Sequence, residues 1–140
     1  MFKLFDSSNF TCTSSLSWSA GYTCVKLYDG KTAGWETKTG HARNAWVDIQ
    51  FHHVLSIDKI AIQQGYNRRF KEFGLLFSNG ESRTISLSDV DLQWNNVSIS
   101  PAIPSASLKL SALDHYSPSY IDKTYYSLRE IRIYGLVPLV

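Results

Sequence analysis

Three short segments of the chain, residues 13–23, 36–45 and 63–70, combine aromatic rings with side chains that make directed hydrogen bonds. The candidate ligand-binding residues are Trp18 and Tyr22 in the first segment, Lys38, His41, Arg43 and Asn44 in the second, and Tyr66, Asn67, Arg68 and Arg69 in the third. An aromatic face packs against the apolar C–H patch of a pyranose ring. Arginine, asparagine and histidine can bridge neighbouring hydroxyl groups. These residue types together suit the recognition of a sugar.

Groups that could catalyse a reaction are poorly arranged. His52 and His53 are adjacent, so on a strand their rings point to opposite faces and cannot chelate one metal ion. The acidic residues are scattered without a pair at catalytic spacing. The sequence contains no nucleophile elbow, zinc-protease motif, phosphate-binding loop or dinucleotide fingerprint. We therefore predict that the protein is not an enzyme.

Short β-type runs must position these segments. The runs cover residues 46–51, 57–62, 73–77, 83–87, 96–100, 107–113 and 128–134. Asn79-Gly80 is a strong hairpin turn between two of them, and no window holds an amphipathic helix longer than about two turns. We predict an all-β fold, an antiparallel β-sandwich or jelly roll formed by one domain over residues 1–140. Alternate connections of a sandwich lie at the same end, so the three segments should cluster there.

Composition narrows the classes of partner. The chain has 140 residues, of which 44% are hydrophobic and 14% aromatic, and its net charge is +2. A charge this even gives no concentrated basic field, so nucleic acid is not an expected partner. There is no apolar run near the roughly 18 residues that a membrane span needs. The start of the chain also lacks the apolar region of a signal peptide, so a secreted protein would be present here in its mature form.

Two features bear on the compartment. Cys12 and Cys24 could form one short-loop disulfide or remain two buried thiols, and the sequence leaves both open. Asn9-Phe10-Thr11 and Asn96-Val97-Ser98 are acceptor sequences for N-glycosylation. These features favour a secreted, extracellular protein.

Several of these runs resemble the discoidin family, also called F5/8 type C domains, which have the galactose-binding-domain-like fold. The segment from Tyr28 to Trp35 is similar to the family's "DG…T..W" loop, and Trp46 to Phe51 is similar to its "W..(V/I)DL" strand. The segments Ile60 to Ile62 and Phe77 to Gly80 follow in order, and Leu128 to Gly135 resembles the closing "lREi.(I/V)yG" strand. The matches run from about residue 12 to 135.

A second resemblance concerns the segment from Gly65 to Phe73. It is similar to the "GYN.R...f...fs.G" stretch of the galactose-binding-like domain attached to some bacterial NAD-glycohydrolases. This resemblance implies a non-enzymatic, glycan-directed module. His41 and Arg68 are also spaced like the histidine and first arginine of F-type fucose-binding lectins. However, Phe70 stands where those lectins have an aspartate, so fucose specificity is not carried over.

The discoidin resemblance also implies a structural calcium site. Many relatives bind the ion between the "DG" loop and the glutamate of the last strand, through carboxylate and backbone oxygens. The matching positions are Asp29 and Glu130, with carbonyl ligands expected near Lys26 and Lys31. Lys26 is a departure, because an asparagine is common there and an ammonium group would weaken the site. A bound ion would be structural.

We therefore predict a carbohydrate-binding lectin that recognises glycans, among them galactose-containing ones, through loops at one end of the sandwich. Single sugar sites are weak, so we expect a homo-oligomer that gains strength from multivalency. The first alternative is a membrane-surface domain that inserts Trp18 while Lys38, Arg43 and Arg68 meet anionic phospholipid head groups. The second alternative is a protein-interaction discoidin domain of an intracellular complex.

Overall fold

The computed structural model describes residues 4–5, 7–8, 10–17, 19–31 and 33–136. Its strands, in chain order, are β1 (Thr11–Ser14), β2 (Trp35–Glu36), β3 (Trp46–Gln64), β4 (Phe70–Phe77), β5 (Ser82–Ser86), β6 (Trp94–His115) and β7 (Ser127–Leu136). Short 3-10 turns lie in the connections, namely η1 (Ala20–Tyr22), η2 (Cys24–Leu27) and η3 (Pro118–Tyr120). Among the described residues, no helix is long and apolar enough to cross a membrane.

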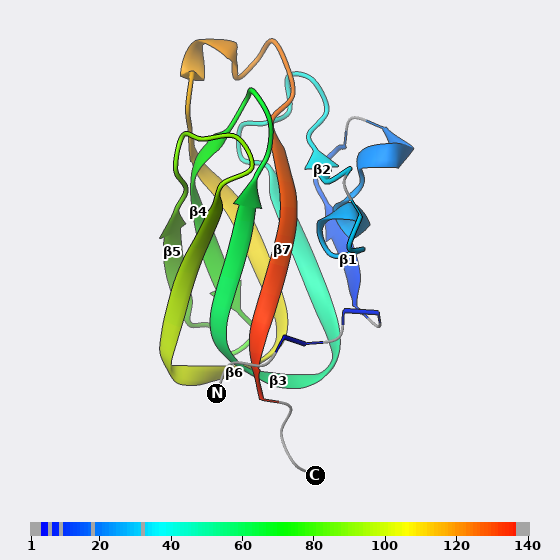
Figure 1. Cartoon of the computed structure of the whole chain (residues 1–140). Coiled ribbons are helices and arrows are strands. Elements are labelled where there is room, and N and C mark those ends of the chain that lie inside the picture. Colours follow the sequence, from blue (N-terminus) through cyan, green and yellow to red (C-terminus); the bar gives the residue numbers. More distant parts are fainter. Residues whose placement is uncertain (1–3, 6, 9, 18, 32, 137–140) are drawn as a thin grey trace.

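The two long strands, β3 and β6, belong to both layers of an antiparallel sandwich (Figure 1). The first half of β3 pairs with β1 and with the second half of β6, which continues through β4 to β5. The second half of β3 pairs with the first half of β6 and with β7, which pairs with β2. The register of β3 against β6 shifts between Gln50 and Leu55, where the strands pass from one layer to the other at the lower end of the view. The predicted all-β sandwich is therefore confirmed.

The core between the layers is made by alternate residues of the strands. Val47 and Ile49 of β3, and Leu108 and Leu110 of β6, are fully buried, while the residues between them are at least partly exposed. This is the period of two that a half-buried strand requires. Aromatic rings fill the upper part of the core, where the indole of Trp35 stacks on the ring of Phe70 with centroids 5.7 Å apart.

The predicted runs lie in the observed strands, but their boundaries differ. The runs 46–51 and 57–62 are one continuous strand, β3, and the runs 96–100 and 107–113 are likewise one strand, β6. The hairpin at Asn79-Gly80 is confirmed, with Gly80 in the left-handed region at a φ of 91°. His52 and His53 lie at the bend of β3, where both side chains are exposed.

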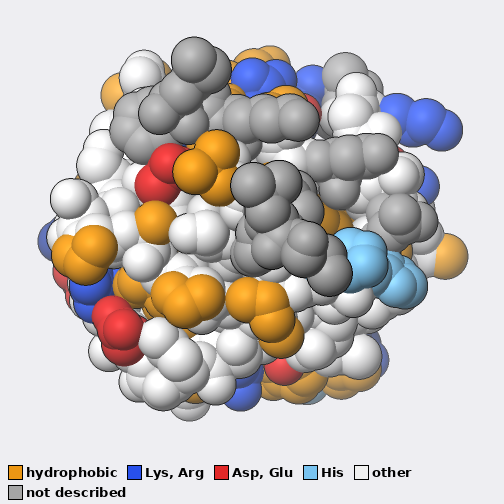
Figure 2. Space-filling view, turned by 90° about the horizontal axis from the view of Figure 1, so that it is seen from below, with side chains coloured by type: hydrophobic (Ala, Val, Ile, Leu, Met, Phe, Trp, Pro, Cys, Tyr) orange, Lys and Arg blue, Asp and Glu red, His pale blue; other side chains and the backbone are white. Residues whose placement is uncertain are grey.

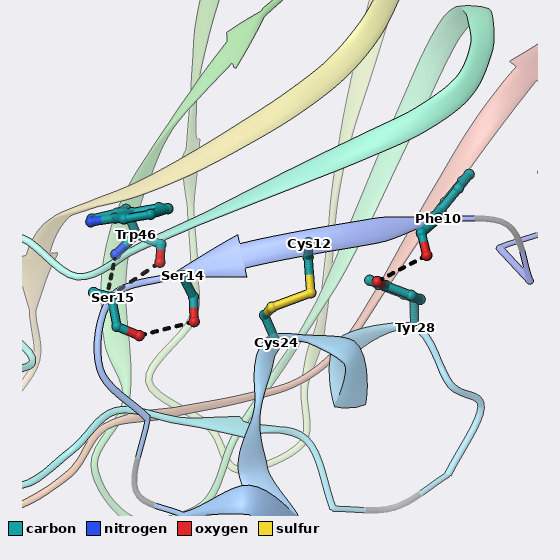
Figure 3. The surroundings of a disulfide bond; sticks show 7 residues. All are labelled: Phe10, Cys12, Ser14, Ser15, Cys24, Tyr28 and Trp46. Carbon is teal, nitrogen blue, oxygen red and sulfur yellow. Dashed lines mark hydrogen bonds between the residues drawn. A yellow bond between two sulfur atoms is a disulfide. The ribbon is translucent and has the colours of Figure 1, made fainter.

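A disulfide bond joins Cys12 of β1 to Cys24 at the start of η2 (Figure 3). Of the two states that the sequence left open, the structure shows the bridged one, with an S–S distance of 2.10 Å. Beside it, the Tyr28 hydroxyl donates a hydrogen bond to the Phe10 carbonyl over 3.3 Å, and the two rings meet edge to face. These contacts fasten β1 to the turn that precedes the Asp29-Gly30 loop.

Candidate functional site

Four connections meet at the upper end of the sandwich in Figure 1, and we call this end the loop end. They are residues 37–45, 65–69, 88–93 and 116–126. The connection 116–126 lies between two of the others. On one side the Gly40 amide donates to the Thr124 carbonyl over 3.3 Å, and on the other the Ser127 amide donates to the Arg68 carbonyl over 3.3 Å. The loop end is thus a connected surface rather than a set of independent loops.

Arg69 fastens the connection 65–69 to the connection 88–93. Its Nε donates to the Asp89 carboxylate over 2.7 Å, and its Nη1 forms a short hydrogen bond with Asp91. The same Asp91 oxygen accepts the backbone N–H of Asn67 over 2.9 Å. Asn67 has a positive φ of 63°, which few residues other than glycine, asparagine and aspartate adopt readily. Asp91 therefore helps to hold the turn that presents Arg68.

The side chain of Arg68 makes different contacts from that of Arg69. Its guanidinium carbon lies 4.1 Å from the centroid of the Tyr120 ring, so the cation stacks on an aromatic side chain of the connection 116–126. Its Nε is buried and has no hydrogen-bond acceptor among the described residues. Tyr120 itself is 44% exposed. The loop end therefore carries a guanidinium, that of Arg68, which stacks on an exposed aromatic ring.

A cluster of packed aromatic side chains lies beneath the connections, around the start of β4. The Phe70 ring contacts Trp35, Phe73, His115 and Tyr126, with centroid distances from 4.7 to 5.7 Å. The Tyr126 hydroxyl is 2.7 and 2.8 Å from two carbonyl oxygens of the connection above it. The His115 Nε2 lies 2.9 Å from the Ala42 carbonyl oxygen, and burial lowers the pKa of this imidazole. Buried contacts therefore fix the loops from below.

Two hollows flank the connection 116–126. A small one of about 40 Å³ is lined by Tyr66, Tyr125, Glu36 and Arg129, among others. Burial raises the pKa of the Glu36 carboxyl. A wider one of about 250 Å³ is lined by Arg43, Asn44, Asp114 and His115, together with apolar groups. The lining of the smaller hollow includes two tyrosines, a carboxylate and a guanidinium. The lining of the wider one combines polar residues with Ala112, Leu113, Pro118 and Ile121 and contains no tyrosine or tryptophan.

Comparisons with known proteins found no matching family model and no matching curated protein. Solved structures do match. An F5/8 type C domain from Bacteroides fragilis has 17% identity and a TM-score of 0.75, covering 98% of both chains. The galactose complex of the family 32 carbohydrate-binding module of NanJ from C. perfringens has 15% identity and a TM-score of 0.76, covering 96% of this chain and 100% of the other. The chain has the galactose-binding-like fold. A chitosan-binding module from a Paenibacillus chitosanase/glucanase also matches, at 17% identity and a TM-score of 0.73, covering 91% of this chain and 95% of that module.

The galactose-binding-like fold brings most of the predicted ligand-binding residues to the loop end, on different sides of the connection 116–126. His41 and Lys38 are exposed on one side, and Tyr66, Asn67 and Arg68 lie on the other. Arg43 and Asn44 line the wider hollow, and the guanidinium of Arg69 is engaged by its two carboxylates. Trp18 lies outside the described residues. Their role in binding stays a prediction.

Tyr22 lies outside the four connections of the loop end. It ends η1, is partly buried, and belongs to the N-terminal segment at the side of the sandwich (Figure 1). This segment still touches the loop end through its earlier part, because the Lys38 amide donates to the Leu16 carbonyl over 2.9 Å. The first and second predicted segments are therefore neighbours.

Sequence reasoning missed the connection 116–126. The residues that it did not predict are Tyr120 and Tyr125 of this connection, Arg129 of β7, and Glu36, which lies in the predicted segment 36–45 but is not among the predicted ligand-binding residues. A signal was present, since four tyrosines fall within residues 116–126. Tyrosine offers an apolar ring and a polar tip, which suits partly exposed binding surfaces. A search for aromatic density outside the predicted strands would have found this segment.

The predicted calcium positions lie near one another. Gly30, which follows Asp29, lines a cavity together with Glu130. The two carboxylates already have cationic partners, however. Lys26 Nζ is 3.8 Å from Asp29, whose other oxygen accepts the Lys31 amide over 2.9 Å, and the Arg132 guanidinium pairs with Glu130 over 2.5 Å. As they stand, these residues do not fit a calcium ion, which would have to displace Lys26 and Arg132. No group of three or more His, Cys, Asp or Glu side chains gathers for a metal among the described residues.

Proposed function

We propose that this protein is a non-catalytic lectin that binds glycans at the loop end. The observation that carries the proposal is the stacking of Arg68, which has no acid partner among the described residues, on the exposed ring of Tyr120, a residue far from it in the sequence. The exposed Tyr66 lies on the same connection as Arg68. Tyr66 is 51% exposed and Tyr120 is 44% exposed, while Arg68 stacks on the second of these rings. The fold supports the proposal, since its structural neighbours include carbohydrate-binding modules.

Each group would contribute differently to the bound sugar. The rings of Tyr66 and Tyr125, at the small hollow, would pack on the C–H face of a pyranose. The Glu36 carboxylate would accept hydroxyl protons, and the Arg68 guanidinium would donate to two neighbouring oxygens. His41 would reach the sugar from the other side of the connection 116–126. Because hydrogen bonds and buried rings already order these loops, binding would need little further ordering.

The arrangement of the chain also suits a displayed lectin. The first described residue, Leu4, pairs with Tyr134 near the end of β7, at the end of the molecule opposite the loops. Attachment to a surface or a second copy through that end would leave the loops free. We propose that the protein is extracellular, which the disulfide supports, and that a homo-oligomer provides multivalent binding. Galactose-containing glycans, and kinship with the domains attached to NAD-glycohydrolases, belong to this proposal as well.

A glycan array probed with the purified, fluorescently labelled protein tests the function. We expect retention on a defined set of glycans, and loss of that retention in Tyr66→Ala. Tyr134→Ala is the matched control, because Tyr134 is a tyrosine on the outer face of β7, where Lys59 stacks on its ring at 4.7 Å. Retention on no glycan, or an equal loss in both variants, would contradict the proposal.

The membrane-surface alternative makes the opposite prediction in a liposome experiment. A lectin should not bind vesicles of phosphatidylcholine and phosphatidylserine, or should dissociate from them when free sugar is added. Binding that depends on phosphatidylserine and resists free sugar would favour the head-group-binding domain. The array is run with and without a calcium chelator, so that the predicted calcium site is tested on the same samples.

A further inference from the structure

Some charged residues of the loop end form ion pairs, and others do not. Arg43 pairs with Asp122 over 3.4 Å, and Arg69 pairs with Asp89 and Asp91. Asp114, the remaining aspartate nearby, lies 3.9 Å from Lys71. Each aspartate of the described loop end therefore has another cationic partner, and none forms an ion pair with Arg68, although Asp89 and Asp91 share the single charge of Arg69.

Arg68 is the arginine of the loop end that has no such acid partner among the described residues. Within the described part of the chain it has no ion pair, and its buried Nε has no acceptor. Leaving a buried charged donor without an acceptor costs more than leaving a neutral one. The charge also acts on its surroundings: burial raises the pKa of Tyr126, and the Arg68 charge partly offsets that rise. Because the Nε is covered, an anionic ligand would meet this charge through the terminal nitrogens of the guanidinium.

Two exposed lysines add to the positive charge of the loop end. Lys38 and Lys123 are exposed, and neither side chain has a partner among the described residues. The hydrogen bond from Gly40 to Thr124 holds their two connections together. Glu36, whose carboxylate has no cationic partner among the described residues, lines the small hollow. At the opposite end of the molecule, the Lys and Arg side chains of the described residues lie mainly around the rim of the view (Figure 2).

We propose that the loop end selects glycans that carry an anionic group, a carboxylate or a sulfate, and that Arg68 receives that group. This inference rests on the proposed function and names its ligand class. The guanidinium presents its N–H donors in a planar fork that matches both oxyanions. Tyr120 supports the plane of the fork from one side. A sugar ring would then lie toward the neighbouring Tyr66, while Lys38 and Lys123 raise the local concentration of anionic chains.

The test compares pairs of immobilised glycans that differ only in the acidic group. Lactose is compared with sialyllactose, and galactose with its sulfate ester, so that carboxylate and sulfate are distinguished. We expect the wild-type protein to prefer the acidic member by about tenfold, because charge-assisted hydrogen bonds are roughly twice as strong as neutral ones. The preference should shrink as salt is raised.

Variants assign the preference to one side chain. Arg68→Gln should bind both members of a pair alike, and Arg68→Lys should keep only part of the preference, because an ammonium lacks the fork. Arg83→Gln is the matched control, since it removes a partly exposed arginine of β5 that lies outside the loop end and already has an acid partner, Glu81, at 3.5 Å. It should leave the preference unchanged.

Each outcome bears on the inference. Equal wild-type binding of neutral and acidic members overturns it, although the proposed lectin function then stands. An equal loss in Arg83→Gln and Arg68→Gln also overturns it, because the preference would then come from general charge. Retention of no glycan of either kind removes both proposals. If Arg68→Gln fails to fold, the wild-type pairs and Arg68→Lys still decide the question.

Discussion

Removing the ring of Phe70 tests whether the core beneath the loops controls binding. The side chain is fully buried and contacts four aromatic groups. Truncating such a phenylalanine to alanine costs about 3–5 kcal/mol. In a chain of this size each kcal/mol lowers Tm by roughly 2–4 °C, so we expect Phe70→Ala to lower it by about 10 °C. Urea denaturation followed by circular dichroism measures the loss directly.

Phe77 supplies the matched control at the other end of the same strand. It is 2% exposed and lies beside the hairpin rather than beneath the loop end. We expect Phe77→Ala to destabilise the protein by a similar amount, while only Phe70→Ala weakens glycan binding. The reason is that the Phe70 ring contacts Tyr126 and His115, which hold the loops above. Binding is measured by calorimetry well below both midpoints. Equal weakening in both variants, or a cost below about 1 kcal/mol for Phe70→Ala, refutes the reasoning.

Three further predictions concern the disulfide, pH and calcium. Replacing Cys12 and Cys24 together by serine should cost about 3 kcal/mol, because the bridge closes a short loop of the unfolded chain; denaturation with and without reductant checks this, and the double variant should not respond to reductant. Burial lowers the pKa of His115 below the ordinary 6.5 in the folded state. Its contribution to stability is therefore complete above pH 6.5 and lost as pH falls through the lowered value, whereas His115→Gln should lack that step in a denaturation series across pH. Because the Lys26 ammonium lies beside Asp29, calcium at about 1 mM should leave the wild-type Tm unchanged and raise that of Lys26→Asn; a rise in the wild-type protein would show that the ion displaces the ammonium.

The strands were predictable because a half-buried strand alternates its side chains. Ile131 and Ile133 are buried on β7 with the exposed Arg132 between them, as the sequence pattern indicates. The continuity of β3 was not predictable in this way. At residues 51–54 the strand passes between layers, the side chains are at least partly exposed, and the alternation is interrupted. A local pattern therefore divides one bent strand into two. The strands β1 and β2 are too short, at four and two residues, to show a period at all.

The candidate site was predictable as far as its residue types and its end of the sandwich. The side of that end on which each residue lies was not, because the connection 116–126 runs between the predicted segments. Its position depends on contacts such as the one from the Tyr126 amide to the Thr37 hydroxyl, 89 residues away in the sequence. No local pattern carries information about a contact of that range. The contact between Tyr120 and Arg68 therefore could not be predicted from the sequence and is known only from the structure.

Arg68 and Arg69 show why adjacent residues of one type can have different functions. The positive φ of Asn67, held by Asp91, sets the direction in which the chain leaves the turn. The two side chains then diverge, one onto the Tyr120 ring and the other between two carboxylates. A guanidinium held by two carboxylates has its charge more than balanced and serves to order a loop, whereas one stacked on a ring keeps its charge. This divergence gives Arg69 a structural role and is the reason why we propose Arg68, and not Arg69, for recognition.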